Sequence, residues 1–357
     1  MKAKVFILLA CFAGSIICIT ILYLLSGAPN TKKNGFTRSF YNTEALKAGY
    51  FLDIQSPEYY IAGSSAQSVY LGNYKDPSDL LTCTKKITDT HHLRLHVEEK
   101  VPQKIILAVE GVSVFAIHRS DSSIQTYSLN TSNDFPIHTY FLSHTRFNMA
   151  VPVSPLSLIL RTVDTNLKQN IISKIDLATG AVKNQKRALD KQLDGFFCTD
   201  GLMDFDPVSG HIFYMYYYRN LLVCLDSNLD IVYKSRSIDS NTTAKLKIGE
   251  IRASEFFTLS APPVKVNQAI AICFGFIFIR SGLLSDRENR QHFGKASVID
   301  QYRESDGKYF GSFYIPDFAG YKVNGFRFLG DNIIALQGHY LVAYPCTRDR
   351  LFIWHRG

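Results

Sequence analysis

The sequence predicts an all-β protein, a β-propeller of six four-stranded blades, preceded by one N-terminal transmembrane helix. Three observations favour this fold class. A turn pattern recurs as Asp176–Gly180, as Asp206–Gly210 and, in a shorter form, as Ser305–Gly307. Segments rich in Ile, Val, Phe and Tyr recur on either side of such turns from Glu58 onward. A long uncharged run stands near the amino terminus.

The recurring turn has a physical cause. Its first residue, Asp, can accept hydrogen bonds from backbone N–H groups just ahead of it, which starts a tight turn. The closing Gly supplies the positive φ that a hairpin turn with a bulge requires. After Gly210 come the aromatic run Ile212–Tyr218 and the apolar run Leu221–Leu225. Such residues suit a pleated, half-buried surface, so the pattern predicts antiparallel hairpins.

The spacing of these segments indicates blades. From Glu58 onward the chain falls into units about 45 to 60 residues long, each with about four short strands. Repeats of about 40 to 50 residues with four strands each are typical of propellers. They are expected near residues 59–84, 104–128, 139–175, 195–238, 256–299 and 312–344. One blade cannot bury both of its faces, whereas a closed ring of blades can. Six blades fit the length best. Rings of five or seven are alternatives, and a β-sandwich or a pair of barrels would explain the strands but not their spacing.

Composition excludes some classes of function. The chain has 357 residues, 46% of them hydrophobic, and a formal net charge of +8 that includes Lys2 and Lys4. The other charges are scattered, so we expect no nucleic-acid partner. Of the 7 Cys, only Cys11 and Cys18 precede the blades. The other five form no close pair and are expected to be small buried hydrophobes rather than a disulfide framework, a metal site or a redox centre.

The uncharged run Val5–Leu25 predicts a signal anchor. A helix of this length reaches about 30 Å, the thickness of the hydrocarbon core of a bilayer. We therefore expect residues 1–28 to be a transmembrane segment that makes the membrane a partner through Val5–Leu25. The chain would then be a single-pass protein of the cytoplasmic membrane, with its large domain facing the periplasm or the cell exterior. Cleavage after Ala28 is the alternative, and lipidation at Cys11 is a lesser one.

The rest of the chain divides into two parts in this prediction. Residues 29–57 are expected to be a linker with a short helical stretch near Thr43–Ala48, and residues 58–357 are expected to form the propeller. The segment Tyr60–Asn73, together with the Asp-x-x-x-Gly turns, resembles bacterial six-bladed propellers of the cell envelope, in the group that includes NHL-like and TolB-like proteins. The resemblance spans roughly Glu58–Cys346. It implies a scaffold, a binding protein or a hydrolase, and it carries over no catalytic residue.

Two clusters could carry chemistry. His92 and His96 would share one face of a strand and His91 the other, but no third metal ligand stands near them, so no metal is expected. Asp200 and Asp204 flank Gly201-Leu-Met, and paired carboxylates can hydrolyse glycosidic bonds. Asp206, the third carboxylate nearby, already starts a turn, and the spacing of the three carboxylates does not fit a calcium-binding loop. A hydrolase of glycans or lactones that uses Asp200 and Asp204 is therefore the alternative function.

The leading hypothesis is a membrane-anchored extracytoplasmic binding or scaffolding module, without catalysis and without a cofactor. Its partner would be a protein or a glycan. Inner strands and their loops line one end of a propeller, so polar residues that interrupt aromatic segments there are candidate ligand-binding residues. These candidates are Arg146, Asn148, Tyr321, Asn324 and Arg327.

Overall fold

A computed structural model describes residues 2–25, 33–40, 46–87, 89–97, 105–131, 134–142, 145–250 and 257–346. The chain divides into two compact units, residues 1–34 and 35–357. The first unit contains the helix α1 (Lys2–Leu25). Among the described residues no helix has the length and apolar character needed to cross a membrane, so the expected transmembrane helix is not supported.

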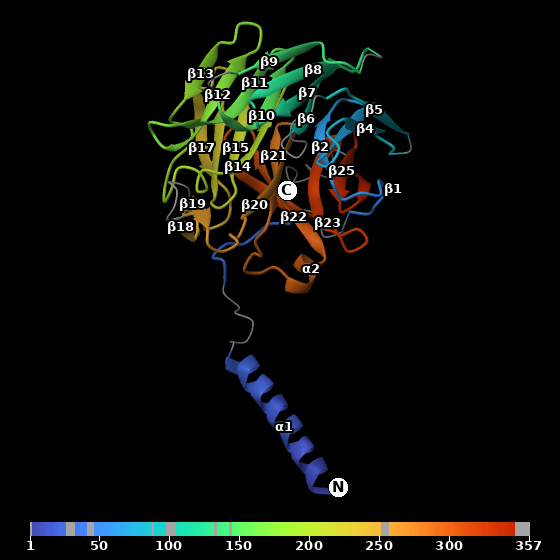
Figure 1. Cartoon of the computed structure of the whole chain (residues 1–357), viewed down its shortest axis with the longest axis vertical. Coiled ribbons are helices and arrows are strands. Elements are labelled where there is room, and N and C mark those ends of the chain that lie inside the picture. Colours follow the sequence, from blue (N-terminus) through green and yellow to red (C-terminus); the bar gives the residue numbers. More distant parts are fainter. Residues whose placement is uncertain are drawn as a thin grey trace, which may run out of the picture. The chain divides into compact units, whose positions relative to one another are not determined.

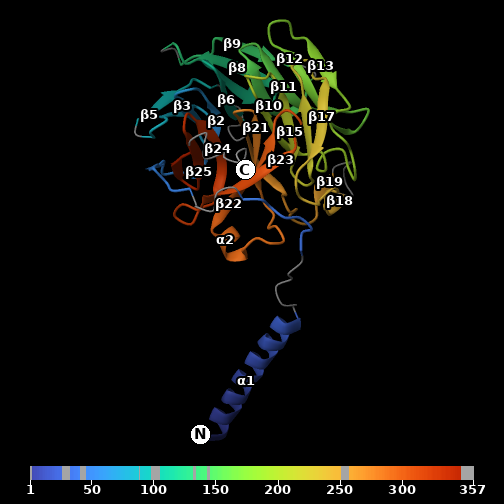
Figure 2. The same cartoon turned by 180° about the vertical axis from the view of Figure 1, so that it is seen from behind.

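The second unit is a propeller (Figures 1 and 2). In the part of the chain that the structure describes, six four-stranded antiparallel sheets form the blades. The first strands of the blades neighbour one another in a closed cycle, with the last beside the first. The predicted six-bladed fold is confirmed. The sandwich, the pair of barrels and the rings of five or seven blades are excluded.

The first three blades are β2–β5 (Tyr59–Ser64, Ser68–Asn73, Asp79–Thr84, Thr90–Arg94), β6–β9 (Ile105–Glu110, Ser113–His118, Ser123–Ser128, His138–Phe141) and β10–β13 (Phe147–Ser154, Ser157–Asp164, Gln169–Asp176, Val182–Gln185). The fourth and fifth are β14–β17 (Gly201–Phe205, Ile212–Tyr216, Leu221–Leu225, Ile231–Arg236) and β20–β23 (Asn267–Cys273, Phe276–Ser281, Ala296–Arg303, Tyr309–Pro316). The sixth combines β24–β26 (Val323–Leu329, Asn332–Gln337, Tyr340–Pro345) with β1 (Tyr50–Asp53). Outside the blades lie the hairpin β18–β19 (Ile248–Glu250, Phe257–Leu259) and the short helix α2 (Arg290–Gly294).

The predicted turn chemistry is present. Asp176 accepts a hydrogen bond from the backbone N–H of Thr179 at 2.8 Å, and Asp206 accepts one from that of Ser209 at 2.9 Å. The glycines that close the three turns all have positive φ, at 71° for Gly180, 75° for Gly210 and 66° for Gly307. The turns therefore join strands within blades, as the sequence predicted.

Two predicted unit boundaries are wrong. The residues around Thr139 form β9, the outer strand of blade two, and the residues around Ser312 form β23, the outer strand of blade five. Both stand just before the loop to the next inner strand, where a sequence pattern of strands does not say which blade a strand joins. Residues 46–48 of the expected helical stretch are not helical, and residues 43–45 lie outside the described residues.

The ring is closed by β1, which lies inside the segment that the sequence assigned to a linker. It pairs with β26 in antiparallel register, with Phe51 opposite Val342 and Leu52 opposite Leu341. In Figures 1 and 2 the blue β1 lies beside the red strands of the last blade. Blade six thus takes its outer strand from the N-terminal side of the chain.

Arg38 anchors the same N-terminal segment to blade five. Its side chain is fully buried and donates to Asp300 at 2.7 Å, to Glu288 at 2.7 Å and to the Ser281 hydroxyl at 2.7 Å. Burial opposes the charge, but Asp300 and Glu288 outweigh it, so the pKa of Arg38 is raised above its usual value. Removing one partner of such a buried pair costs about 3–5 kcal/mol, because the other charges are left without compensation.

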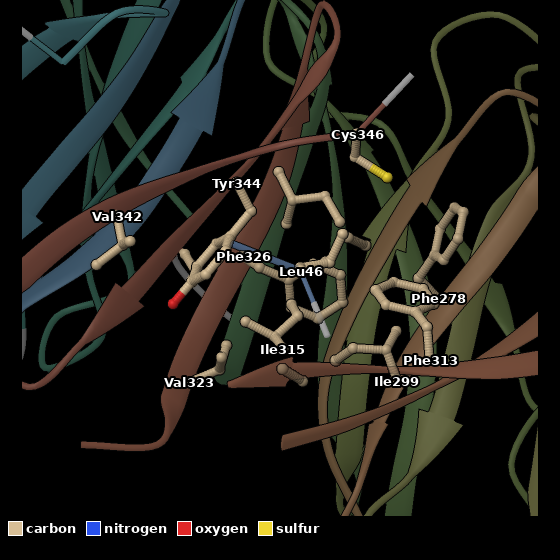
Figure 3. Close-up of a cluster of buried hydrophobic side chains, with 14 residues drawn as sticks. Leu46, Phe278, Ile299, Phe313, Ile315, Val323, Phe326, Val342, Tyr344 and Cys346 are labelled. Atoms are coloured by element: carbon tan, nitrogen blue, oxygen red, sulfur yellow. The ribbon is translucent and has the colours of Figure 1, made fainter. Parts of the chain in front are cut away.

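Apolar side chains fill the spaces between neighbouring blades. Between blades five and six, Phe278 and Ile299 pack against Val323 and Phe326. Leu46, from the N-terminal segment, is buried in this cluster, and Figure 3 shows it among Ile315, Phe326 and Tyr344. The N-terminal segment therefore adds to the core as well as to the sheet.

Candidate functional site

The two ends of the ring carry different groups. Because every blade repeats the same up-and-down order, the six inner strands β2, β6, β10, β14, β20 and β24 begin at one end, which we call the N-end, and finish at the other, the C-end. Side chains at either end can meet across the centre only when they come from different blades. Groups from different blades meet at both ends.

At the N-end, Arg161 organises a cluster with Asn148, Asp200 and Tyr214, named here the Arg161 cluster. Arg161 lies on β11 and is buried. It donates to Asn148 Oδ1 at 2.7 Å, to Tyr214 Oη at 2.9 Å and to Asp200 Oδ1. Burial works against this cation, but Tyr214 and Asp200 outweigh it and raise its pKa. Asp200 keeps 30% of its side chain exposed, so a buried arginine holds an accessible carboxylate.

Tyrosines surround this carboxylate. Tyr74 and Tyr217 each directly follow the second strand of their blade, in blades one and four, which lie opposite each other in the ring. Burial, then Asp200, raises the pKa of Tyr217 to about 12, and Tyr74 adds a smaller upward push. Both tyrosines therefore stand at the N-end, where the second strands finish. Tyr60 packs against Tyr74 with 4.3 Å between ring centroids, and Lys265 Nζ lies 4.4 Å from the centroid of the Tyr217 ring.

At the C-end, an ion pair bridges blades four and six. Arg327 Nη2 lies 3.4 Å from Asp204 Oδ2, and Arg327 Nη1 donates to the carbonyl of Ile270 in blade five at 2.8 Å. Burial raises the pKa of Asp204, although Arg327 opposes this. Burial, and then the charge of Asp204, also raises the pKa of Glu110 on β6 of blade two. Blades two, four and six thus supply the titratable groups of this cluster, and blade five adds a backbone carbonyl.

The sequence candidates divide between these places. Asn148 and Asp200 meet in the Arg161 cluster, and Asp204 and Arg327 form the C-end ion pair. Arg146 is exposed just before β10. At the start of blade six, Tyr321 and Asn324 are also exposed, and the Tyr321 ring lies near His339 rather than near the Arg161 cluster.

The two carboxylates proposed for hydrolysis do not form a pair. Asp200 and Asp204 are four residues apart along β14 and the residue before it. At about 3.3 Å per residue they are separated by about 13 Å, beyond the roughly 5–9.5 Å between the carboxyl groups of glycosidases. Asp204 instead influences Glu110, whose pKa is raised by burial and then by the charge of Asp204. The only sequence signal for it is an acidic residue at the end of the apolar run Ile105–Val109.

The histidines do not converge either. His92 Nδ1 lies 2.7 Å from Asp79 Oδ1, whereas the His96 ring packs against Phe135. Across the described ranges no three His, Cys, Asp or Glu side chains are grouped as metal ligands. Cys83 and Cys224 are buried, and burial raises the pKa of each thiol to about 12, as expected of small hydrophobes.

Comparisons with known proteins carry no argument about this chain. No family model and no curated protein matches the chain. Among solved structures, a member of the DUF4221 family from Bacteroides vulgatus is similar, with 14% sequence identity, a TM-score of 0.49, and coverage of 84% of this chain and 97% of that chain. At this TM-score the likeness carries no argument about fold or function, and the expected place in the NHL-like and TolB-like group stays a prediction.

The C-end cluster predicts a measurable coupling. Asp204→Asn removes the charge that raises the pKa of Glu110, so that pKa should fall toward its ordinary value. A carboxyl whose pKa is raised by folding contributes stability that is present below its unfolded pKa and is lost as pH rises through the folded pKa. In the variant, the stability that Glu110 contributes should therefore be lost over a narrower pH range, and at lower pH, than in the natural protein. Carbon-13 NMR titration of the Glu110 carboxyl measures the change directly.

The exposed carboxylate of Asp230, in a hairpin of blade four, provides the control. Asp230→Asn should leave the titration of Glu110 unchanged. An unchanged Glu110 titration in Asp204→Asn would show that the two carboxylates are not coupled.

Proposed function

We propose that this protein is an extracytoplasmic binding or scaffolding module whose ligand binds at the N-end of the ring. One observation carries the proposal. At the N-end the buried Arg161 holds the accessible carboxylate of Asp200 in place, and Tyr74 and Tyr217, from opposite blades, stand at the same end. Aromatic faces together with a few fixed polar groups are the usual lining of a ligand site.

The chemistry of the N-end suits a saccharide. Tyrosine rings offer flat apolar faces for a sugar ring, while Asp200 and the exposed Asn148 offer acceptors and a donor for its hydroxyls. Because Arg161 bonds both of these residues, their orientation is set before a ligand arrives, which reduces the entropy lost on binding. A glycan is therefore the favoured partner, and a protein is the alternative.

A hydrolase is the second candidate. The observation in its favour is the pair Glu110 and Asp204 at the C-end, since both carboxyls have raised pKa values and paired carboxylates with shifted pKa values serve acid–base catalysis. Asp204 is already engaged by Arg327, which weighs against a free nucleophile or base. We therefore rank binding above hydrolysis.

The binding proposal predicts that Tyr217→Ala lowers affinity for a glycan by about ten-fold or more, equivalent to about 1.4 kcal/mol, because one stacking face is lost. Tyr217→Phe should keep most of the affinity. A glycan array with the full chain identifies the saccharide, and titration calorimetry then measures the variants.

Phe141→Ala is the matched control, since Phe141 is an exposed aromatic residue on the outer strand of blade two, far from the inner strands. Equal affinity of Tyr217→Ala and Phe141→Ala would contradict a site at the N-end. Cleavage of a bound glycan that is abolished by Glu110→Gln would favour the hydrolase instead.

We further propose that the leader attaches the propeller to the cytoplasmic membrane, with the propeller on the periplasmic or outer side. The supports are the uncharged run Val5–Leu25, the exposed apolar side chains of α1, such as Phe6 and Phe12, and the resemblance to cell-envelope propellers. Exposed apolar side chains in such numbers are unfavourable in water and call for an apolar environment.

Cell fractionation tests this attachment. The full chain is expected to sediment with membranes, and a variant without residues 1–28 is expected to stay in the supernatant. Protease added to intact spheroplasts should then digest the propeller of the full chain. A full chain found in the supernatant would refute the attachment, and a propeller protected in spheroplasts would reverse the proposed side.

A further inference from the structure

Two arginines occupy equivalent positions in different blades. Arg161 lies on the second strand of blade three, opposite Met149, and Arg280 lies on the second strand of blade five, opposite Ala269. In both blades the inner strand has a register shift just before that opposite residue. Because the second strands run toward the N-end, both guanidinium groups belong to that end of the ring.

Both arginines also face the next blade. Arg161 reaches Asp200 and Tyr214 in blade four. Arg280 shares its strand face with Phe278, which packs against Val323 and Phe326 of blade six. The next blade therefore determines whether the charge of each arginine is compensated.

Blade six lacks the partners that blade four provides. The residue directly before the inner strand is Asp200 in blade four, but it is Lys322 in blade six. Tyr214 faces blade three and lies two residues before Tyr216, the partner of the first residue of β14. The residue in that place in blade six is Ala335, which faces blade five. A cation and an apolar residue thus replace the carboxylate and the hydroxyl.

Arg280 consequently stands without direct compensation. Within the described residues its guanidinium makes no hydrogen bond and no ion pair. Asp317 influences it from a distance, but Asp317 Oδ2 lies 3.6 Å from Lys322 Nζ. Burial lowers the pKa of Arg280 to about 10, the opposite direction from Arg161. The fold accordingly keeps a partly buried cation at a cost that Asp317 offsets only in part.

We propose that Arg280 is the subsite for an oxyanion of the ligand, the carboxylate of an acidic sugar. A guanidinium presents two parallel N–H donors to a carboxylate or phosphate, the geometry that an acidic sugar or a phosphate would use. This inference rests on the proposed function, because the sugar ring would bind at the same N-end. It adds that the ligand is anionic.

Thermal unfolding of the full chain tests the inference, with D-glucuronate, D-glucose and inorganic phosphate as probes at constant ionic strength. Glucuronate should raise the Tm of the natural protein in a saturable manner, and Arg280→Gln should abolish this rise. Without any probe, Arg280→Gln should unfold at the same Tm as the natural protein or at a higher one, because an uncompensated cation is removed. A lower Tm without probe would overturn the inference, since Arg280 would then be structural.

Arg303→Gln is the control, because Arg303 lies in an exposed hairpin at the C-end. It should keep the full response to glucuronate. A response to phosphate alone that requires Arg280 would support an oxyanion subsite but assign it to a phosphorylated ligand. No anion-dependent rise in Tm, or one that Arg280→Gln retains, would overturn the inference.

The two proposals can fail separately. Binding of glucose and glucuronate with equal affinity, dependent on Tyr217 and not on Arg280, would overturn the oxyanion subsite and leave the binding site at the N-end. A glucuronate response that requires Arg280 but persists in Tyr217→Ala would support the subsite and contradict the placement of the ligand on Tyr217.

Discussion

Pairing of β1 with β26 is the constraint on which the rest of the structure depends. Residues of the ring centre meet only because the ring is closed: Asp204 and Arg327, which form an ion pair, come from blades four and six. Closure requires a strand from the N-terminal side of the chain to join the last blade. Arg38 binds the same segment to blade five, and Leu46 packs it into the core between blades five and six. The closing strand is therefore held by its pairing with β26 and by the residues that precede it.

The two ends of the closed ring use charge in different ways. At the C-end, Asp204 and Arg327 neutralise each other across the centre, and the polar groups there are largely engaged with the protein itself. At the N-end, the partners are unequal. Arg161 is satisfied and in turn orients an accessible carboxylate, whereas Arg280 has no direct partner among the described residues. The N-end therefore holds an accessible carboxylate, Asp200, and a guanidinium without a direct protein partner, Arg280, which is the physical reason for placing the ligand there.

Local patterns made much of the fold predictable, and long-range pairing limited the rest. The Asp-to-Gly turns and the spacing of strands depend on neighbours in sequence, so six blades could be inferred. β1 could not be inferred, because its four residues form a strand only by pairing with β26, almost the whole chain away. The same limit applied to the site. Asp200 and Asp204 looked like a pair because they are close in sequence, yet they lie near opposite ends of β14. Glu110 is influenced by Asp204 only because the ring is folded. Arg161 was missed since it stands in an apolar strand that reads as core.

The closing strand can be tested by hydrogen–deuterium exchange of the full chain carrying Leu52→Pro, with Leu52→Ala as the control. Proline at this position cannot donate a ladder hydrogen bond and disturbs the pairing with β26, whereas alanine keeps the backbone intact. If ring closure holds the centre together, the proline variant should exchange faster along β26 and also along the inner strands β24 and β2. Faster exchange confined to β1, with β24 and β2 as protected as in the alanine control, would contradict the dependence of the ring centre on this strand.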